Sequence, residues 1–323
     1  MSGYFKNLLK KTSRHSDFSW LGSLFCFYML FSNPATGKKN MEYKYILSMN
    51  THRSVCVVRL NEMMAMENVD SRSGTESSGL NITAFLENGN NTLSVSMGKK
   101  AIDKEFKKFN PDSWCEAIIR KASAHDQGQI VSYIKLSVDK NGDIVIHTSP
   151  NHIANNSSDF DFLGMSKTRG EKGLYQAKKI YPINGLPDWM WTKARSVSEN
   201  DLPSIKSFYQ EIIDTFSHND LDKLWSMSKP AWEEWAVADN SNPKIFFNSM
   251  DFEEMLNSGD YIIRTKPEWE NFRLVSYKDG RLFRLEKGAF GRSPILLDNK
   301  ITGDTATYSP YLSIINGKIV IAR

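Results

Sequence analysis

Hydrophobic and polar residues alternate with a period of two along most of residues 41–150. This period is typical of strands that bury one face, and no segment in this range shows the 3.6-residue period of a helix. Strands are expected at 42–49, 54–66, 92–97, 114–122, 129–138 and 143–148. A polar loop is expected at 70–79, followed by the start of a strand at Leu80, and a last strand at 173–181 is expected to close the first sheet. Turns rich in Gly and Asn separate several of these strands, so the first half is predicted to be an antiparallel β-sandwich.

The pattern becomes helical after residue 200. Ile205, Phe208, Ile212 and Phe216 recur at the spacing of one helix face, which predicts a helix over 203–217. A short helix over 218–228, another that starts at Pro230, a helix over 243–258, and strands at 260–265, 271–278, 281–287, 293–298, 305–315 and 318–322 are expected to follow. This half is therefore predicted to be a group of helices followed by a curved antiparallel sheet.

These changes of pattern divide the chain into four segments. They are a targeting segment (1–40), a β-sandwich (41–182), a linker (183–200) and an α+β unit (201–323). The fold class is therefore α+β with more than one unit. Trp189 and Trp191 alternate within the linker, so we expect one or both to dock against a neighbouring surface.

Charge is concentrated at the N-terminus. The net charge of the chain is +4, and residues 1–40 hold six Lys or Arg residues against Asp17 alone, which leaves −1 for the remainder. A nucleic-acid-binding protein needs clustered basic residues to neutralise phosphate charge. The nearly neutral body therefore argues against nucleic acid as a partner.

The first forty residues have the proportions of a signal peptide. A basic region from Lys6 to Arg14 precedes the fourteen uncharged residues 18–31, and small residues follow at Ala35 and Gly37. Such an apolar run is short for a bilayer span. We therefore expect a periplasmic or secreted protein. The alternatives are a cytoplasmic protein that starts at Met41 and a protein that keeps this segment as a membrane anchor.

Removal of such a segment would leave two cysteines, Cys56 and Cys115, both in predicted strands. Two buried thiols are the favoured interpretation, because free cysteine behaves as a small apolar residue. A disulfide is the alternative, since an exported protein meets oxidising conditions.

Known catalytic signatures are missing from the sequence. It contains no glycine-rich phosphate loop, no zinc-binding H-E-x-x-H, no C-x-x-C and no G-x-S-x-G nucleophile elbow. His147 and His152 are five residues apart across Pro150, which does not place them on one helix face. Glu211 and Asp214 are expected on a solvated face of the first helix. We therefore expect no metal, no cofactor and no catalytic residue.

Two stretches carry resemblances to known families. The segment "CVVRLNEMM … GLNITAFLENGNNTLSVSM" resembles the galactose-binding-like jelly-roll modules found with glycoside hydrolases. The matching positions are Leu60, Asn61, Leu80, Ile82, Thr83, Leu86, Gly89, Asn91, Thr92, Leu93 and Val95. Glu62 stands where the family usually has Gly. The resemblance implies a fold and says little about sugar binding, because these are core and turn residues.

The second resemblance covers the helical half. "FYQEIIDTFSHNDLDKLWSMS" and the terminal "YLSIINGKIVIAR" resemble the NTF2-like, or SnoaL-like, fold, in which a bent sheet wraps a long helix and leaves a cone-shaped pocket. The fold implies a pocket lined by a set of aromatic residues: Trp225, Trp232, Trp235, Trp269, Tyr308 and Tyr311. Core packing is the favoured interpretation of these residues, because aromatic side chains at helical spacing are usually buried.

Together these patterns predict an exported, two-unit binding protein without catalytic activity. The partner is expected to be another protein, as for bacterial envelope proteins or immunity proteins that neutralise a toxin. One alternative is a small-molecule-binding protein or an isomerase or hydratase that uses the cone. Another is a carbohydrate-binding protein that uses the sandwich.

Overall fold

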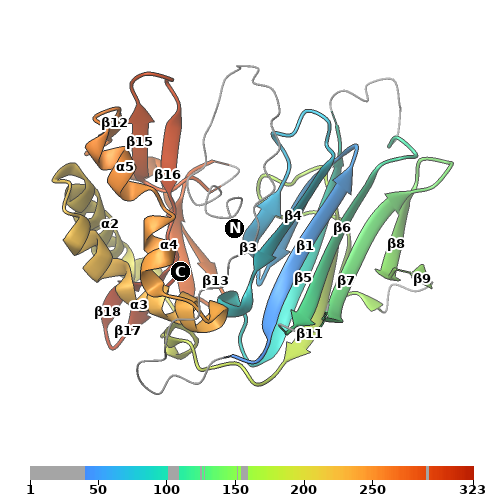
Figure 1. Cartoon of the computed structure of the whole chain (residues 1–323). Coiled ribbons are helices and arrows are strands. Elements are labelled where there is room, and N and C mark those ends of the chain that lie inside the picture. The colour runs from blue at the N-terminus through green and yellow to red at the C-terminus, as the bar shows by residue number, and fades with distance from the viewer. Residues whose placement is uncertain are drawn as a thin grey trace.

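The computed structural model describes residues 41–100, 109–123, 126, 128–150, 152–153, 159–288 and 291–323. Its first half consists mostly of strands, and its second half combines helices with shorter strands (Figure 1). All four sheets are antiparallel, so the expected α+β class is confirmed. The predicted targeting segment 1–40 lies outside the described residues.

The first half contains two large sheets. Its strands are β1 (Lys44–His52), β2 (Ser54–Leu60), β3 (Met63–Glu67), β4 (Glu76–Asn81), β5 (Gly89–Lys99), β6 (Trp114–Ala122), β7 (Gln129–Val138), β8 (Ile144–Ser149), β9 (His152–Ile153), β10 (Phe162–Met165) and β11 (Tyr175–Ile183). They form one sheet in the order β4-β1-β6-β7-β8-β9 and another in the order β10-β11-β5-β2-β3. Leu47 and Met49 of the first sheet share a core with Val58 and Val95 of the second. The two sheets therefore pack face to face, as in a β-sandwich.

Two local predictions for this half were wrong. Residues 54–66 do not form one strand, because Asn61 and Glu62 adopt positive φ angles of 50° and 69° and reverse the chain between β2 and β3. Part of the polar loop expected at 70–79 forms β4, which pairs with the edge of β1. Strand β4 lies at the sheet edge and buries only Leu80, so its sequence shows no alternation of apolar and polar residues.

The second half, residues 202–323, places helices beside two smaller sheets. Its elements are α2 (Leu202–Ser217), α3 (Leu221–Asp239), α4 (Pro243–Asn248), α5 (Phe252–Asn257), β12 (Tyr261–Ile263), β13 (Arg273–Tyr277), β14 (Leu282–Glu286), β15 (Ile295–Asn299), β16 (Thr305–Tyr308), β17 (Leu312–Ile315) and β18 (Lys318–Ile321). The sheets run in the orders β12-β15-β16 and β13-β14-β17-β18. Ile205, Ile212 and Phe216 of α2 are buried, which is the face that the sequence predicts.

Three boundaries in this half differ from expectation. Helix α3 continues through Pro230, because buried Leu224, Trp232 and Trp235 hold both parts against the core and the proline removes one backbone donor. The helix expected over 243–258 is broken at Asp251, which has a φ of 56°. The strand expected over 305–315 is interrupted between β16 and β17, where Pro310 cannot donate a ladder hydrogen bond.

The two halves share one continuous hydrophobic core. Trp189 and Trp191, expected to dock from the linker, are 1% and 0% exposed. Their indole nitrogens donate to the carbonyl oxygens of Leu86 and Ala84 in the sandwich, at 2.9 and 3.2 Å. At the other end of the chain, Arg323 donates to the Ala84 carbonyl at 2.7 Å. The segment between the halves therefore belongs to the core that joins them.

Candidate functional site

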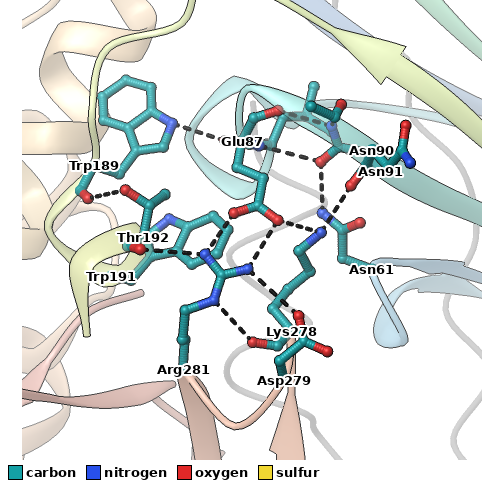
Figure 2. Close-up of polar contacts among 12 residues, drawn as sticks. Asn61, Glu87, Asn90, Asn91, Trp189, Trp191, Thr192, Lys278, Asp279 and Arg281 are labelled. Atoms are coloured by element: carbon teal, nitrogen blue, oxygen red, sulfur yellow. Dashed lines mark hydrogen bonds and ion pairs between the residues drawn. The ribbon is translucent and has the colours of Figure 1, made fainter. Parts of the chain in front are cut away.

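An ion triad fixes the second half against the sandwich. The Glu87 carboxylate accepts from Arg281 Nη1 at 2.6 Å and Nη2 at 2.9 Å, and it lies 2.5 Å from Lys278 Nζ (Figure 2). Burial raises the pKa of Glu87, but the bonds from Arg281 and Lys278 outweigh burial, so its pKa lies below the usual value. Lys278 also donates to the Asn90 carbonyl at 2.9 Å, which ties the β13–β14 hairpin to the β5 turn.

Two asparagines, Asn61 and Asn91, stabilise that turn through hydrogen bonds (Figure 2). Asn61 is 1% exposed, and its amide donates to the Phe85 carbonyl at 3.0 Å and to Asn91 Oδ1 at 2.9 Å. Its oxygen accepts from the Thr92 amide at 2.9 Å. Asn91 in turn bonds both the amide and the carbonyl of Glu87. The Asn residues of the jelly-roll-like motif thus position Glu87, and through it the second half.

A pocket of about 490 Å³ lies between the halves. We call it the interface pocket. One wall is the outer face of β2, β5 and β11, and the other is the edge formed by β13 and β14. Its charged lining residues are Arg59, Glu62, Arg169, Lys178, Arg273, Arg284 and Glu286. Because the ion triad and the shared core join both walls, the pocket is formed before any ligand arrives.

The sandwich wall is polar because alternate residues of its strands point away from the core. Arg59, Ser94 and Lys178 form one row across β2, β5 and β11, since Ser94 is paired with both of the others. The residues next to Ser94 in β5, Leu93 and Val95, are fully buried in the sandwich core. A strand with this pattern contributes to the core on one face and to the pocket on the other.

Arg59 is held in place by a buried carboxylate. Glu171 is 2% exposed, and its Oε1 lies 2.5 Å from Arg59 Nε. Its Oε2 accepts from Ser96 Oγ at 2.7 Å, Ser166 Oγ at 3.1 Å and Gln176 Nε2 at 3.3 Å. A carboxylate with this many donors is fully satisfied, so Glu171 has the role of a fixed counter-ion.

The opposite wall contains a second buried ion pair. Arg284 and Glu286 are 7% and 6% exposed, and Arg284 Nε donates to Glu286 Oε1 at 2.6 Å. Tyr277 Oη donates to the same oxygen. Burial raises the pKa of Glu286, but the charge of Arg284 and these hydrogen bonds outweigh it and hold the pKa below its usual value. Glu286 is therefore ionised and positions Arg284.

Several strong donors at this pocket remain uncommitted. Among the described residues, Arg284 Nη1 and Nη2 donate no hydrogen bond, and neither does the side chain of Arg273 or Arg169. A Cβ added at Gly291, another lining residue, would stand 2.8 Å from Arg284 Nη2, so this end of the guanidinium is at the pocket wall. The Arg284 guanidinium also lies over the Tyr311 ring, with its carbon 4.5 Å from the centroid.

Tyr311 adds a buried hydroxyl without a partner. The residue is 4% exposed, and its Oη has no hydrogen-bond partner in the described part of the chain. Burial raises the pKa of Tyr311 and Arg284 partly opposes the rise, so the hydroxyl stays protonated and can donate.

The six aromatic residues proposed for a cone lie in different surroundings. Trp232 and Trp235 of α3 and Tyr308 are buried, and Tyr308 packs edge-on against Phe216 and Phe252. Trp269 is half-buried in a short 3₁₀ helix. Trp225 lines a separate pocket of about 570 Å³, where it contacts Phe247. Tyr311 lines a separate small cavity, and its ring contacts Arg284, which lines the interface pocket.

The other residues singled out in the sequence lie elsewhere. Cys56 and Cys115 form a disulfide between β2 and β6, with their Cα atoms 5.9 Å apart. His147 Nε2 is 2.8 Å from Ser137 Oγ, and the side chain of His152 lies outside the described residues. Glu211 and Asp214 are exposed.

The described residues contain neither a metal-binding cluster nor a helix suited to span a bilayer. Within these ranges, no group of three or more His, Cys, Asp or Glu residues has an arrangement suited to a metal ion. No described helix is both long and apolar enough to span a bilayer.

Sequence reasoning missed the main residues of the interface pocket. A weak signal was present in the predicted strand 281–287, where Arg284 and Glu286 are two residues apart and so share one face. Arg59 likewise interrupts the apolar residues of β2. Nothing in the sequence links these positions to each other or to Glu171, because the pairing depends on the tertiary fold.

Comparison of the chain with family models, with curated proteins and with solved structures finds no match in any of the three.

Proposed function

We propose that this chain is an exported, non-catalytic binding protein whose partner is another protein, of the envelope-accessory or immunity type. The interface pocket is the proposed binding site. The observation that carries the proposal is a preformed pocket with uncommitted arginines, built jointly by the two halves of one core. Preformed concave sites with a few convergent polar groups are the usual form of a binding site.

Two features support the remaining parts of this proposal. The Cys56–Cys115 disulfide suits an oxidising compartment, which favours export. The described helices beside antiparallel sheets are compatible with an NTF2-like unit, and the Asn61–Asn91 hydrogen bond is compatible with a jelly-roll module. We propose these two fold types on that basis.

An enzyme that uses this pocket is the second candidate. It is favoured by the meeting of Glu286 with Tyr277 at the pocket wall. General acid–base catalysis works best when the pKa of the group is near the working pH. The pKa of Glu286 is held below its usual value by Arg284 and Tyr277, which fits a counter-ion better than a catalytic acid.

The carbohydrate-binding alternative receives no support from the surface. It predicts an exposed strip of aromatic residues on the sandwich. The large apolar side chains exposed in the described ranges are isoleucines and one methionine. Trp114, at the start of β6, is half-buried and has Lys135 Nζ 4.6 Å from its ring centroid.

The proposal is tested by blocking the pocket. Ser276 is an exposed lining residue in the edge strand β13, and Ser77 is an exposed serine in the edge strand β4, away from the pocket. We expect immobilised wild-type protein and Ser77→Trp to retain the same protein from an envelope extract of the source organism. Ser276→Trp is expected to lose most of it. Retention of nothing by the wild-type protein, or equal retention by both variants, would contradict the proposal.

A further inference from the structure

The interface pocket has more cationic than anionic groups. Five cationic side chains line it, and Glu62, Glu286 and the underlying Glu171 provide three carboxylates, which leaves a surplus of two positive charges. Two of the carboxylates, Glu171 and Glu286, already bind Arg59 and Arg284 and are buried. The remaining charge is therefore available to a ligand.

The orientation of the donors is as informative as their charge. Glu286 occupies Arg284 Nε, which leaves the outer Nη1 and Nη2 edge without a partner among the described residues. This edge presents parallel N–H donors in the geometry that binds two oxygens of one carboxylate or phosphate. Arg284 Nη1 and Nη2 are not among the buried unpaired atoms of the described residues, so they are open to the pocket, where a charge-assisted hydrogen bond would stabilise a bound anion.

Other side chains lie near the Arg284 guanidinium or on the same face of the sheet. Arg273 is paired in register with Glu286 across β13 and β14, so its side chain is on the same face of the sheet as Arg284. The Tyr311 ring packs against the Arg284 guanidinium, whose carbon lies 4.5 Å from the ring centroid. Two half-buried apolar residues, Leu274 and Val275, give the pocket an apolar part.

We infer that the interface pocket binds an oxyanion, a carboxylate or a phosphate, with Arg284 and Arg273 on its oxygens. This inference rests on the proposed binding function of the pocket and names its ligand chemistry. The anion belongs either to an acidic group of the protein partner or to a free small molecule, and the two sources give different results below.

Titration calorimetry with sodium phosphate and with citrate, at fixed ionic strength, tests the inference on the full-length chain. Arg273→Gln removes one half-buried guanidinium that has no protein partner among the described residues. Arg120→Gln, on β6 away from the pocket, removes another half-buried one as a matched control. We expect saturable binding of one anion per chain, weakened about tenfold or more by Arg273→Gln and unchanged by Arg120→Gln. Thermal unfolding checks that each variant is folded.

Failure of this inference and failure of the proposed function give different results. If neither anion binds, or if Arg273→Gln binds as tightly as Arg120→Gln, the oxyanion inference is wrong, even where Ser276→Trp still prevents protein capture. If phosphate or citrate binds through Arg273 and releases the captured protein, the partner supplies the acidic group. If the anion binds through Arg273 and no protein is captured, the ligand is a free anion, and only the protein partner is disproved.

Discussion

At the scale of single residues, Asn61 and the asparagines of the motif "NITAFLENGNNTL" (81–93) have structural roles. Asn61 satisfies the Phe85 carbonyl and the Thr92 amide, and it tolerates the positive φ that its turn requires. The motif was predictable from the sequence because it is local. Asn61, which bonds to this motif, was assigned to a strand. Its role was not predictable because it depends on contacts with residues 24 and 31 positions away.

Replacement of Asn61 by Ala should therefore be costly. The variant leaves two buried backbone groups without partners, so we expect the free energy of unfolding to fall by about 3 kcal/mol. Asn90→Ala is the matched control, because Asn90 is exposed and contributes only its carbonyl oxygen to Lys278. Urea unfolding at neutral pH measures both values. If Asn61→Ala lowers the free energy of unfolding by less than about 0.5 kcal/mol, as an ordinary surface substitution does, Asn61 does not have this structural role.

At the scale of elements, period-two and helical patterns predicted most strands and helix α2. They failed where an element depends on a neighbour. Helix α3 continues through Pro230 because the core holds both of its parts, and β4 is a strand because β1 offers it an edge. The strand pattern also placed Cys56 and Cys115 correctly in β2 and β6, but it did not show that these strands lie in opposing sheets.

The disulfide that joins those sheets gives an element-scale prediction. In protein prepared without reductant, peptide mapping should find Cys56 and Cys115 in one cross-linked fragment. Replacement of both cysteines by Ala should lower the free energy of unfolding by about 2–4 kcal/mol, because the bridge restricts the unfolded chain. Alkylation of both cysteines in the unreduced protein would show free thiols, as expected for a cytoplasmic protein that starts at Met41.

At the scale of the whole molecule, long-range charge pairs determine how the halves meet. Glu87 and Arg281, which join the halves, are 194 residues apart in the sequence, and Arg59 and Glu171, which are both in the sandwich, are 112 apart. Each of these residues looks like an ordinary surface charge in the sequence. Glu171 is buried by partners within the sandwich, and Glu87 is covered where the two halves meet. The interface pocket was therefore not predictable, although strands were predicted over parts of the segments that form its walls.

The triad at Glu87 predicts how stability responds to pH. The folded pKa of Glu87 is lower than its ordinary value of 4.5, so its contribution is complete above pH 4.5 and is lost as the pH falls through the folded pKa. At neutral pH, Glu87→Gln should lower the free energy of unfolding by about 2–3 kcal/mol, because Arg281 and Lys278 lose their counter-ion. The variant should also lose less stability than the wild type as the pH falls below 4.5.

Glu233→Gln is the control for this experiment. The Glu233 side chain is 43% exposed and pairs with Lys229 at 4.0 Å, so the change should be within about 0.5 kcal/mol. Urea unfolding at neutral pH and at pH values below 4.5 provides the comparison. An equal acid response in wild type and Glu87→Gln would show that the triad does not determine this pH dependence.

Hydrogen–deuterium exchange of the chain with its captured partner bound tests most directly the claim that the binding site lies between the two halves. Amides in β5 and in the β13–β14 hairpin should exchange more slowly in the complex than in the free chain, while β8, at the far side of the sandwich, should not change (Figure 1). Slower exchange in one half alone, or only at strands away from the interface pocket, would contradict the account.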